Sequence, residues 1–244
     1  MSLAPPALAA LFASFAVAAS PAPAAPITRT AVKDTYVDSA NRSANFGAAT
    51  TADITTSTNH ATGTSQTTFV SFNVAGVGQV AAAELAIQKV SGRGDRTVAL
   101  WGVTDESFDA FDETALTWDG GVAAGVLRDG TGASLVNEVR VGNVGTTEPR
   151  NDGAIVYTRS AVSVATANAL VDFINADTNG IVTFALHQDQ GNANLFRFAT
   201  RENTTSGYIA PTLVLTAVPE PTSLTGLALA GALLLHRRRH RLSR

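Results

Sequence analysis

Short runs in which apolar and polar residues alternate recur along the middle of the chain. In QTTFVSFNV, Val70 and Phe72 share one face, and in AAAELAIQKV, Leu85 and Ile87 share one. Because successive side chains of a strand point to opposite faces, each run predicts a strand with one buried face. Similar runs predict further strands at 32–38, 52–57, 97–104, 135–141, 155–158, 181–188, 195–201 and 212–216.

One segment has helical spacing instead. In TANALVDFINA at 166–176, Leu170, Phe173 and Ile174 fall three and four positions apart, and Gly180 follows as a stop signal. About ten strands, one short helix and no Gly-rich phosphate loop predict an all-β protein, a β-sandwich of jelly-roll type. The polar stretch at 119–153 is expected to form a long loop.

The composition supports a folded body. Hydrophobic residues make up 45% of the 244 positions and charged residues 15%, which is opposite to the signature of disordered proteins. The chain has no Cys, which excludes disulfides, a thiol nucleophile and thiolate metal sites. Five of the 17 basic residues lie at 237–244, so residues 26–217 carry 12 Lys and Arg against 19 Asp and Glu, a net charge of −7. This acidic body makes nucleic acid an unfavourable partner.

The amino end has the pattern of a secretory signal peptide. Residues 8–19 (LAALFASFAVAA) are apolar or small, and the Ser-, Pro- and Ala-rich segment after them offers A-x-A-like cleavage sites up to residue 25. Segment 1–25 is therefore expected to form a short apolar helix that is removed on secretion. A buried Ala-rich helix is the alternative, although Pro21 and Pro23 would end it at once.

The carboxyl end combines three features in order. Pro219, Glu220 and Pro221 precede the twelve-residue apolar stretch 224–235, and a basic cluster at 236–244 follows. Twelve residues make about 18 Å of helix, short of the roughly 30 Å hydrocarbon core, so this short apolar helix is expected to anchor only transiently in the inner membrane. The positive-inside rule keeps the basic end in the cytoplasm and the body across the membrane. An ordinary C-terminal anchor is the alternative.

This three-part tail resembles a PEP-CTERM protein-sorting signal. The resemblance implies that a membrane protease of the exosortase type recognises Pro219, Glu220 and Pro221, removes the tail and passes the protein on. It also implies a Gram-negative-type bacterium, with the processed protein at the cell surface or in the exopolysaccharide matrix.

The body resembles DNRLRE-type domains. The matching blocks are DTYVDSANRSANFG at 34–47, TTFVSFNVAGV followed by AAAELAIQKV, LWGVTDESFDAFDETALTW at 100–118, and FALHQDQGNANLFRFATRE at 184–202. The resemblance implies a jelly-roll carbohydrate-binding module of a kind sometimes attached to alginate-degrading enzymes. It also implies calcium as a structural ion, because jelly-roll sugar-binding modules often hold one.

Asp34 and Asp38 are the candidate calcium ligands. They lie with Asn41 and Asn45 in an opening segment rich in side-chain oxygens, and Ca²⁺ takes about six to eight oxygen ligands. The resemblance to sugar-binding modules supports a structural Ca²⁺ at these residues. The alternative is that the same side chains cap turns beside the first strand.

Four residues near the C-terminus are the candidate carbohydrate contacts. Pairing of the strands at 181–188 and 195–201 across the turn between them would bring His187 within one neighbour of Arg197. Arginine forks bind carboxylates through two hydrogen bonds, so Arg197 and Arg201 are expected to grip a uronate polysaccharide while Gln188 contacts its hydroxyls. The alternative is that these arginines pair with Glu202 or a nearby Asp.

The sequence carries no recognisable catalytic motif. G-x-S-x-G and H-E-x-x-H are both absent. Glycoside hydrolysis needs two carboxylates about 5 to 9 Å apart, and one acidic run offers candidates for it. Calcium ligation and a solvated loop that orders Trp118 are the other interpretations of this run, which consists of Asp105, Glu106, Asp109, Asp112, Glu113 and Asp119.

The sequence therefore predicts a signal peptide at 1–25, a β-sandwich at 26–217 and a sorting segment at 218–244. We expect a secreted, non-catalytic protein of the cell surface or matrix that binds extracellular polysaccharide, with an acidic, alginate-like polymer as the favoured class. Two alternatives stay open: a structural matrix protein without a specific ligand, and a polysaccharide lyase or hydrolase.

Overall fold

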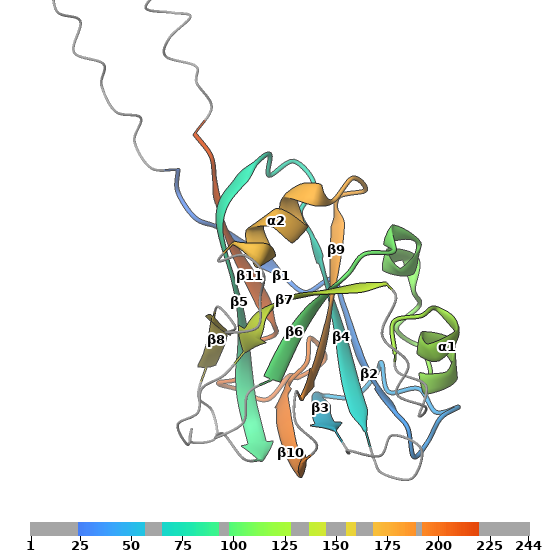
Figure 1. Ribbon diagram of the computed structural model, residues 1–244. Coiled ribbons are helices and arrows are strands. Elements are labelled where there is room, and N and C mark those ends of the chain that lie inside the picture. Colours follow the sequence, from blue (N-terminus) through green and yellow to red (C-terminus); the bar gives the residue numbers. More distant parts are fainter. Residues whose placement is uncertain are drawn as a thin grey trace, which may run out of the picture. The chain divides into compact units, whose positions relative to one another are not determined.

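Antiparallel strands make up most of the described chain (Figure 1). The computed structural model describes residues 24–56, 65–92, 98–127, 137–144, 155–159, 168–188 and 192–219. These ranges contain α1 (Trp118–Ala123), α2 (Ala169–Ala176) and a 3-10 helix, η1 (Glu106–Ala110). Their strands are β1 (Ile27–Thr30), β2 (Lys33–Asp38), β3 (Thr51–Thr56), β4 (Gln66–Asn73), β5 (Val80–Gly92), β6 (Val98–Val103), β7 (Glu138–Val144), β8 (Ile155–Arg159), β9 (Ile181–Gln188), β10 (Asn192–Ala199) and β11 (Thr212–Ala217).

The strands form two layers that share one core. One layer has the order β1, β11, β5, β10 and β3, and the other has β4, β9, β6, β7 and β8, with β2 beside β4. The layers join where Thr55 of β3 pairs with Gln66 of β4, and again where β5 pairs with β8. This curled antiparallel arrangement confirms the predicted all-β sandwich of jelly-roll type.

The main core fills the space between the layers. Val70, Phe72 and Phe184 enter it from β4 and β9, and each is 0% exposed. Phe196 and Phe198 enter it from β10 and are at most 1% exposed. These are the faces that period-two alternation predicts. Full burial of one such side chain contributes about 1.5–3 kcal/mol, so this core stabilises the fold most.

A second apolar cluster covers the outer face of β4 and β9. Phe69 and Ala185 are 0% exposed there, beneath a segment that contributes Phe108, Phe111 and Trp118. The rings of Phe69 and Phe108 lie 5.1 Å apart between centroids. Both faces of this layer are therefore buried, which explains why β4 carries apolar or small polar residues at every position of its middle.

The expected long loop at 119–153 is wrong in two places. α1 begins at Trp118, and β7 occupies Glu138–Val144, where it overlaps the strand predicted at 135–141. Thr117 caps α1, because its Oγ1 accepts a hydrogen bond from the Gly120 N–H at 3.2 Å. A Cβ at Gly121 would overlap the Leu127 side chain, so glycine is needed for close packing here. Glycine costs about 1 kcal/mol in a helix relative to Ala, which disguised this helix in the sequence.

The other helix, α2, is the one that the sequence predicts. Leu170 and Ile174 are buried and face the main core. Phe173 crosses Gly102 of β6 so closely that a Cβ on Gly102 would lie 2.5 Å from the Phe173 ring. Gly180, with φ of +81°, then turns the chain into β9. Figure 1 shows α2 at the upper end of the sandwich and α1 at its right side.

Several predictions about the two ends fall outside the described residues. Both expected terminal helices lie there, as do Glu220 and Pro221 of the sorting motif, whereas Pro219 is described. Residues Ala24–Val218 form one compact unit. None of the helices within the described ranges is long and apolar enough to cross a membrane.

Candidate functional site

The predicted pairing of the two C-terminal strands is wrong. His187 of β9 lies opposite Ala99 of β6, whereas Arg197 of β10 lies opposite Asp53 of β3. β9 and β10 therefore belong to different layers of the sandwich. Alternation fixes the faces of a strand but not its neighbours, which in this topology come from distant parts of the chain. Gln188 ends β9, opposite Val98 of β6.

Arg197 is held by the residue opposite it. Its Nε donates to Asp53 Oδ1 at 2.6 Å and its second terminal nitrogen donates to Asp53 Oδ2 at 2.8 Å. The Asp53 side chain is 9% exposed and that of Arg197 is 36% exposed. The hydrogen bond to Asp53 raises the pKa of Arg197 above its usual value. Asp53 thus fixes a guanidinium whose outer part faces solvent.

Two aromatic side chains lie beside this pair. Tyr36 of β2 and Phe46 stack with ring centroids 4.3 Å apart and planes 14° from parallel. Both are half-buried. Burial raises the pKa of the Tyr36 hydroxyl, and so do the nearby charges of Asp53 and Asp38, whereas Arg197 lowers it. We refer to Tyr36, Phe46, Asp53 and Arg197 together as the Tyr36 surface.

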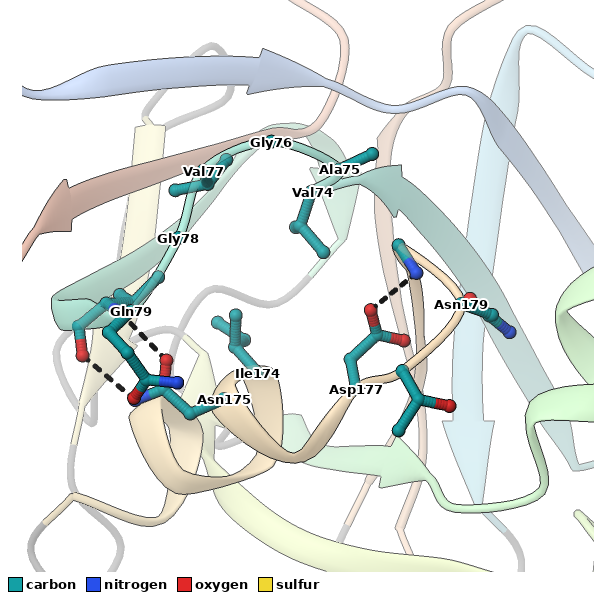
Figure 2. A pocket seen from close by; sticks show the side chains of 13 residues that line it. Val74, Ala75, Gly76, Val77, Gly78, Gln79, Ile174, Asn175, Asp177 and Asn179 are labelled. Carbon is teal, nitrogen blue, oxygen red and sulfur yellow. Dashed lines mark hydrogen bonds between the residues drawn. The ribbon is translucent and has the colours of Figure 1, made fainter.

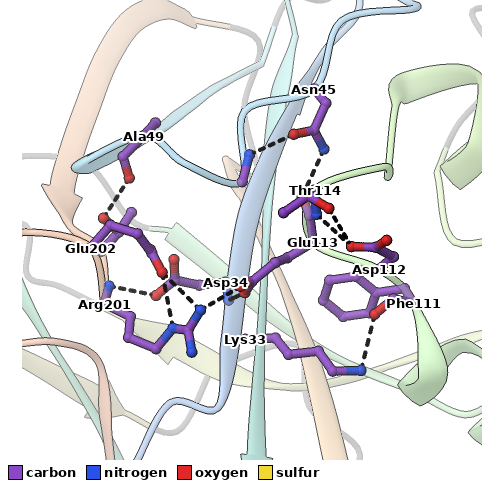
Figure 3. A network of polar contacts seen from close by, with 12 residues as sticks. Lys33, Asp34, Asn45, Ala49, Phe111, Asp112, Glu113, Thr114, Arg201 and Glu202 are labelled. Atoms are coloured by element: carbon purple, nitrogen blue, oxygen red, sulfur yellow. Dashed lines mark hydrogen bonds and ion pairs between the residues drawn. The ribbon is translucent and has the colours of Figure 1, made fainter.

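Arg201 belongs to a different, more enclosed group (Figure 3). Its guanidinium forms an ion pair with Glu113, and its Nε donates to Glu202 Oε1 at 3.0 Å. Its backbone N–H donates to Asp34 Oδ2 at 2.8 Å, while the Asp34 N–H donates to Glu113 Oε2 at 3.2 Å. These contacts tie β2, the segment after η1 and the turn after β10 to one another.

Asp34 is a buried carboxyl group within this cluster, and its pKa is raised. It is 1% exposed, and its side chain is hydrogen-bonded to that of Glu202, which requires one of the two carboxyl groups to carry a proton. Burial raises the pKa of Asp34 to about 8, with Glu202 adding to the rise and the Arg201 N–H opposing it. In the protein alone, Asp34 therefore holds a proton at neutral pH.

Asp38 lies elsewhere and has other partners. It is four residues further along β2, which is about 13 Å. Its Oδ1 accepts from the Ala40 N–H at 2.8 Å and its Oδ2 from Asn41 Nδ2 at 3.0 Å, the pattern of a turn cap. Asp34 and Asp38 therefore do not share one ligand shell.

A cation fits Asp34 better when Glu202 is its companion. Once Asp34 has lost its proton, the carboxylates of Asp34 and Glu202 would together supply part of the shell that Ca²⁺ needs. Within the described ranges, no group of three His, Cys, Asp or Glu residues is arranged to hold a metal ion. Calcium at Asp34 stays a prediction, and backbone oxygens or water would have to complete its shell.

The two tryptophans have no open face for a ligand. Trp118 is 2% exposed and lies in the second apolar cluster. Trp101 stacks on His187 at 5.5 Å between centroids, and the Arg140 guanidinium lies 5.4 Å from its ring. His187 and Arg140 come from the strands on either side of β6, so they flank Trp101 from both sides. Tyr36 and Phe46 are also partly exposed, and Tyr36 packs against the edge of the main core.

The acidic run has structural partners throughout. Asp105 and Asp112 accept hydrogen bonds from Ser107 and Thr114 two residues on, at 3.0 and 2.8 Å from the backbone N–H groups. Asp119 forms an exposed ion pair with Arg42 at 2.7 Å. The remaining members contact other segments: Glu106 contacts Thr178, Asp109 contacts Thr183 and Asn179, and Glu113 contacts Arg201. This network supports the interpretation of the run as a structural loop.

The sequence signals of the Tyr36 surface were present but ambiguous. Tyr36 stands between Asp34 and Asp38 in DTYVD, where alternation suggests an ordinary half-buried strand. Asp53 is the one charged residue within TADITT, and a single charge on a strand usually faces solvent. Only the pairing of β3 with β10 shows that Asp53 meets Arg197.

Part of the chain is similar to a known protein family. Residues 25–123 match the family model of carbohydrate-binding module family 96. The matched range runs from before β1 to the end of α1 and includes Tyr36, Phe46 and Asp53. No curated protein matches the chain. Over residues 25–123 the chain is thus similar to carbohydrate-binding module family 96, and it contains a carbohydrate-binding-module-like domain.

Proposed function

We propose that this protein binds an extracellular polysaccharide without cleaving it, and that the Tyr36 surface is the contact. The observation that carries the proposal is the stacked pair of Tyr36 and Phe46 beside the exposed side of Arg197, within a domain whose larger part matches a carbohydrate-binding family. Aromatic rings present a flat apolar face that suits the C–H face of a sugar, and a polar edge that suits its hydroxyls.

Arg197 supplies the selectivity for acidic sugars. A guanidinium has five N–H donors, and Asp53 accepts from two of its nitrogens. The remaining donors stay available for a uronate carboxylate, in the fork geometry that carboxylates favour. Because Asp53 already fixes the side chain, binding costs less conformational entropy than it would for a free arginine.

The other predicted contact residues, Arg201 and His187, are secondary in this proposal. Arg201 bonds Glu113 and Glu202, and His187 stacks on Trp101. We therefore assign the polysaccharide to Arg197 first, with an alginate-like polymer as the proposed class. The net charge of −7 over residues 26–217 opposes an acidic polymer at long range, so binding should be local to this surface.

Secretion and sorting complete the proposal. Signal-peptide removal near residue 25 and recognition of Pro219, Glu220 and Pro221 by an exosortase would deliver the domain to the cell surface or matrix of a Gram-negative-type bacterium. Co-expression with an exosortase should shorten the chain at its C-terminus, as measured by intact mass. Replacing Glu220 by Ala should prevent this shortening. If the wild-type chain keeps its full mass in the presence of an exosortase, exosortase is not its partner.

Affinity electrophoresis tests the binding itself. We expect the full chain to be retarded in gels that contain alginate, relative to gels without polymer. The double variant Arg197→Gln with Asp53→Asn removes the ion pair without leaving a buried charge, and it should lose this retardation. The matched control removes the exposed ion pair by Arg42→Gln with Asp119→Asn, and it should migrate like the wild type.

Three outcomes would contradict the proposal. Equal retardation of the two double variants would discard the Tyr36 surface as the binding site. Unchanged mobility of the wild type in alginate, pectin, xylan and cellulose gels would favour a structural matrix protein. Release of reducing or unsaturated ends from any of these polymers would instead favour an enzyme.

A further inference from the structure

A pocket of about 370 Å³ lies beside the last turn of α2, and none of its lining residues belongs to the Tyr36 surface (Figure 2). Its walls are the turn 74–80 between β4 and β5 and the segment 174–180 that leads from α2 into β9. Figure 2 shows Ile174 and Asp177 pointing from the helix side toward the turn that carries Gly76 and Gly78. Small-molecule sites in proteins have volumes from about 300 Å³ upward.

The two walls are tied together by hydrogen bonds. Asn175 accepts from the Val80 N–H at 2.8 Å and donates to the Val80 carbonyl at 2.9 Å. The Val74 N–H donates to the Gly180 carbonyl at 2.9 Å, and the Gly180 N–H donates to Asp177 Oδ2 at 2.7 Å. The pocket is therefore formed before any ligand arrives, and little conformational entropy would be lost on binding.

The lining combines an apolar floor with polar edges. Ile174 and Val77 supply apolar surface, while Asp177 and Gln79 supply polar groups. Gly76 and Gly78 adopt φ of +74° and +73°, and a Cβ on either residue would meet nothing within 4 Å. These two glycines leave the backbone of the turn open to close approach by a ligand.

The charge of this region is negative. The lining contains Asp177 and, among its described members, no Lys or Arg. Burial raises the pKa of Asp177, and the charges of Glu106 and Asp109 raise it further. Arg29, which is not a lining residue, donates to the carbonyl of Ala75 at 3.5 Å. A uronate carboxylate would be repelled here, whereas neutral hydroxyl groups would find a strong acceptor.

We infer that this pocket is a second carbohydrate site, specific for a neutral sugar unit whose hydroxyls donate to Asp177. The inference rests on the proposed carbohydrate binding and divides it between two surfaces: Arg197 faces acidic sugars and Asp177 faces neutral ones. A polymer that contains both kinds of unit, or two different polymers, would then be held at two places on one domain.

Calorimetric titration of the full chain tests the inference, with four neutral tetrasaccharides built from glucose, xylose, mannose and N-acetylglucosamine as probes. At least one probe should bind, and its affinity should not change with salt because no ligand charge is involved. Asp177→Asn keeps an acceptor for the Gly180 N–H but loses the charge, and it should bind at least tenfold more weakly. Gln79→Ala, at an exposed position of the rim, should weaken binding to a smaller extent.

Matched controls separate this pocket from the Tyr36 surface. Asp172→Asn makes the same change of charge on an exposed residue of α2 outside the pocket, and it should bind like the wild type. The Arg197→Gln, Asp53→Asn variant should also keep its affinity for the neutral probe. Absence of binding by all four probes would overturn the inference, as would equal affinity of Asp177→Asn and the wild type. Retardation in alginate without neutral binding would leave the proposed function intact and remove only the second site.

Discussion

Asp53 and Arg197 stand 144 positions apart in the sequence and are joined by two hydrogen bonds, of 2.6 and 2.8 Å. The pair links β3 to β10, and the Asp53 carbonyl also accepts from Thr68 Oγ1 of β4, where the two layers meet. Its carboxylate is 9% exposed and its guanidinium side chain is 36% exposed. One ion pair thus joins two neighbouring strands of one layer and orients a donor group toward solvent.

Because Asp53 is more buried than Arg197, variants that break this pair in different ways should lose different amounts of folding free energy. Arg197→Ala leaves the enclosed Asp53 carboxylate without its partner, so we expect a loss of about 1–2 kcal/mol in the free energy of unfolding. Arg197→Gln with Asp53→Asn should lose less than that, because no buried charge remains. Urea unfolding of the two variants measures the difference, and a larger loss in the double variant would contradict this account.

The protonated state of Asp34 predicts how stability depends on pH. Its pKa is about 8 in the folded protein against 3.8 for the ordinary side chain, so the folded state binds the extra proton between these values. This contribution to stability is full below about pH 4 and is lost progressively as the pH rises toward 8.

Asp34→Asn tests this pH dependence. The variant keeps an acceptor for the Arg201 N–H and cannot titrate, so its melting temperature should fall less between pH 4 and pH 8 than that of the wild type. Differential scanning calorimetry at several pH values measures both slopes. Asp172→Asn serves as the control, because this residue is exposed. Identical slopes in Asp34→Asn and the wild type would show that Asp34 is ionised throughout.

Calcium and the proton should compete for Asp34. A cation held by Asp34 and Glu202 requires the ionised carboxylate, so binding at pH 7 should release a proton and raise the melting temperature. The rise should be smaller at pH 5 and should vanish on addition of a chelator. A melting temperature that does not respond to Ca²⁺ at pH 8 would exclude a structural calcium at this position.

Gly47 should tolerate no side chain. A Cβ at Gly47 would overlap the backbone carbonyl of Glu113, which neighbouring Asn45 also binds through its Nδ2 at 2.7 Å. Gly47→Ala must therefore displace backbone, and we expect a loss of about 1–3 kcal/mol with a shifted Phe46 ring.

Gly120→Ala is the matched control for this substitution. A Cβ at Gly120 would make ordinary contacts at 3.5 and 3.6 Å, and Ala favours the helix by up to about 1 kcal/mol. The control should therefore be as stable as the wild type or more stable. Chemical denaturation compares the two variants, and equal stability of both would contradict the close packing at Gly47.

Period-two alternation was sufficient to predict most strands and their faces. Phe196 and Phe198 face the core as expected, because a one-residue shift would place both in solvent. The same pattern failed to identify partners: His187 and Arg197 lie on neighbouring strands in the sequence but on opposite layers of the fold. β1 was missed because it is only four residues long and half exposed.

The candidate sites, too, could be predicted only in part from the sequence. The charged side chains of Asp34 and Arg201 mark them as candidates in the sequence. Both contact Glu113, however, which is distant from each of them in the sequence, so no local pattern predicts this cluster. Tyr36 and Phe46 lie in the block at 34–47 that resembles DNRLRE-type domains, but only their stacking in the structure brings the two rings together. The pocket at Asp177 depends on Asn175 reaching Val80, 95 positions away, which no local pattern encodes.

The strand order also determines when the domain can form during synthesis. β11 lies between β1 and β5, β10 lies between β5 and β3, and β9 lies between β4 and β6, so late strands are inserted between early ones. A fragment that ends at residue 123 lacks Phe184, Phe196 and Leu213, three buried members of the main core. Closure of such distant pairings places folding in the range of about milliseconds to seconds. The ribosome must therefore synthesise nearly the entire domain before the native structure can form.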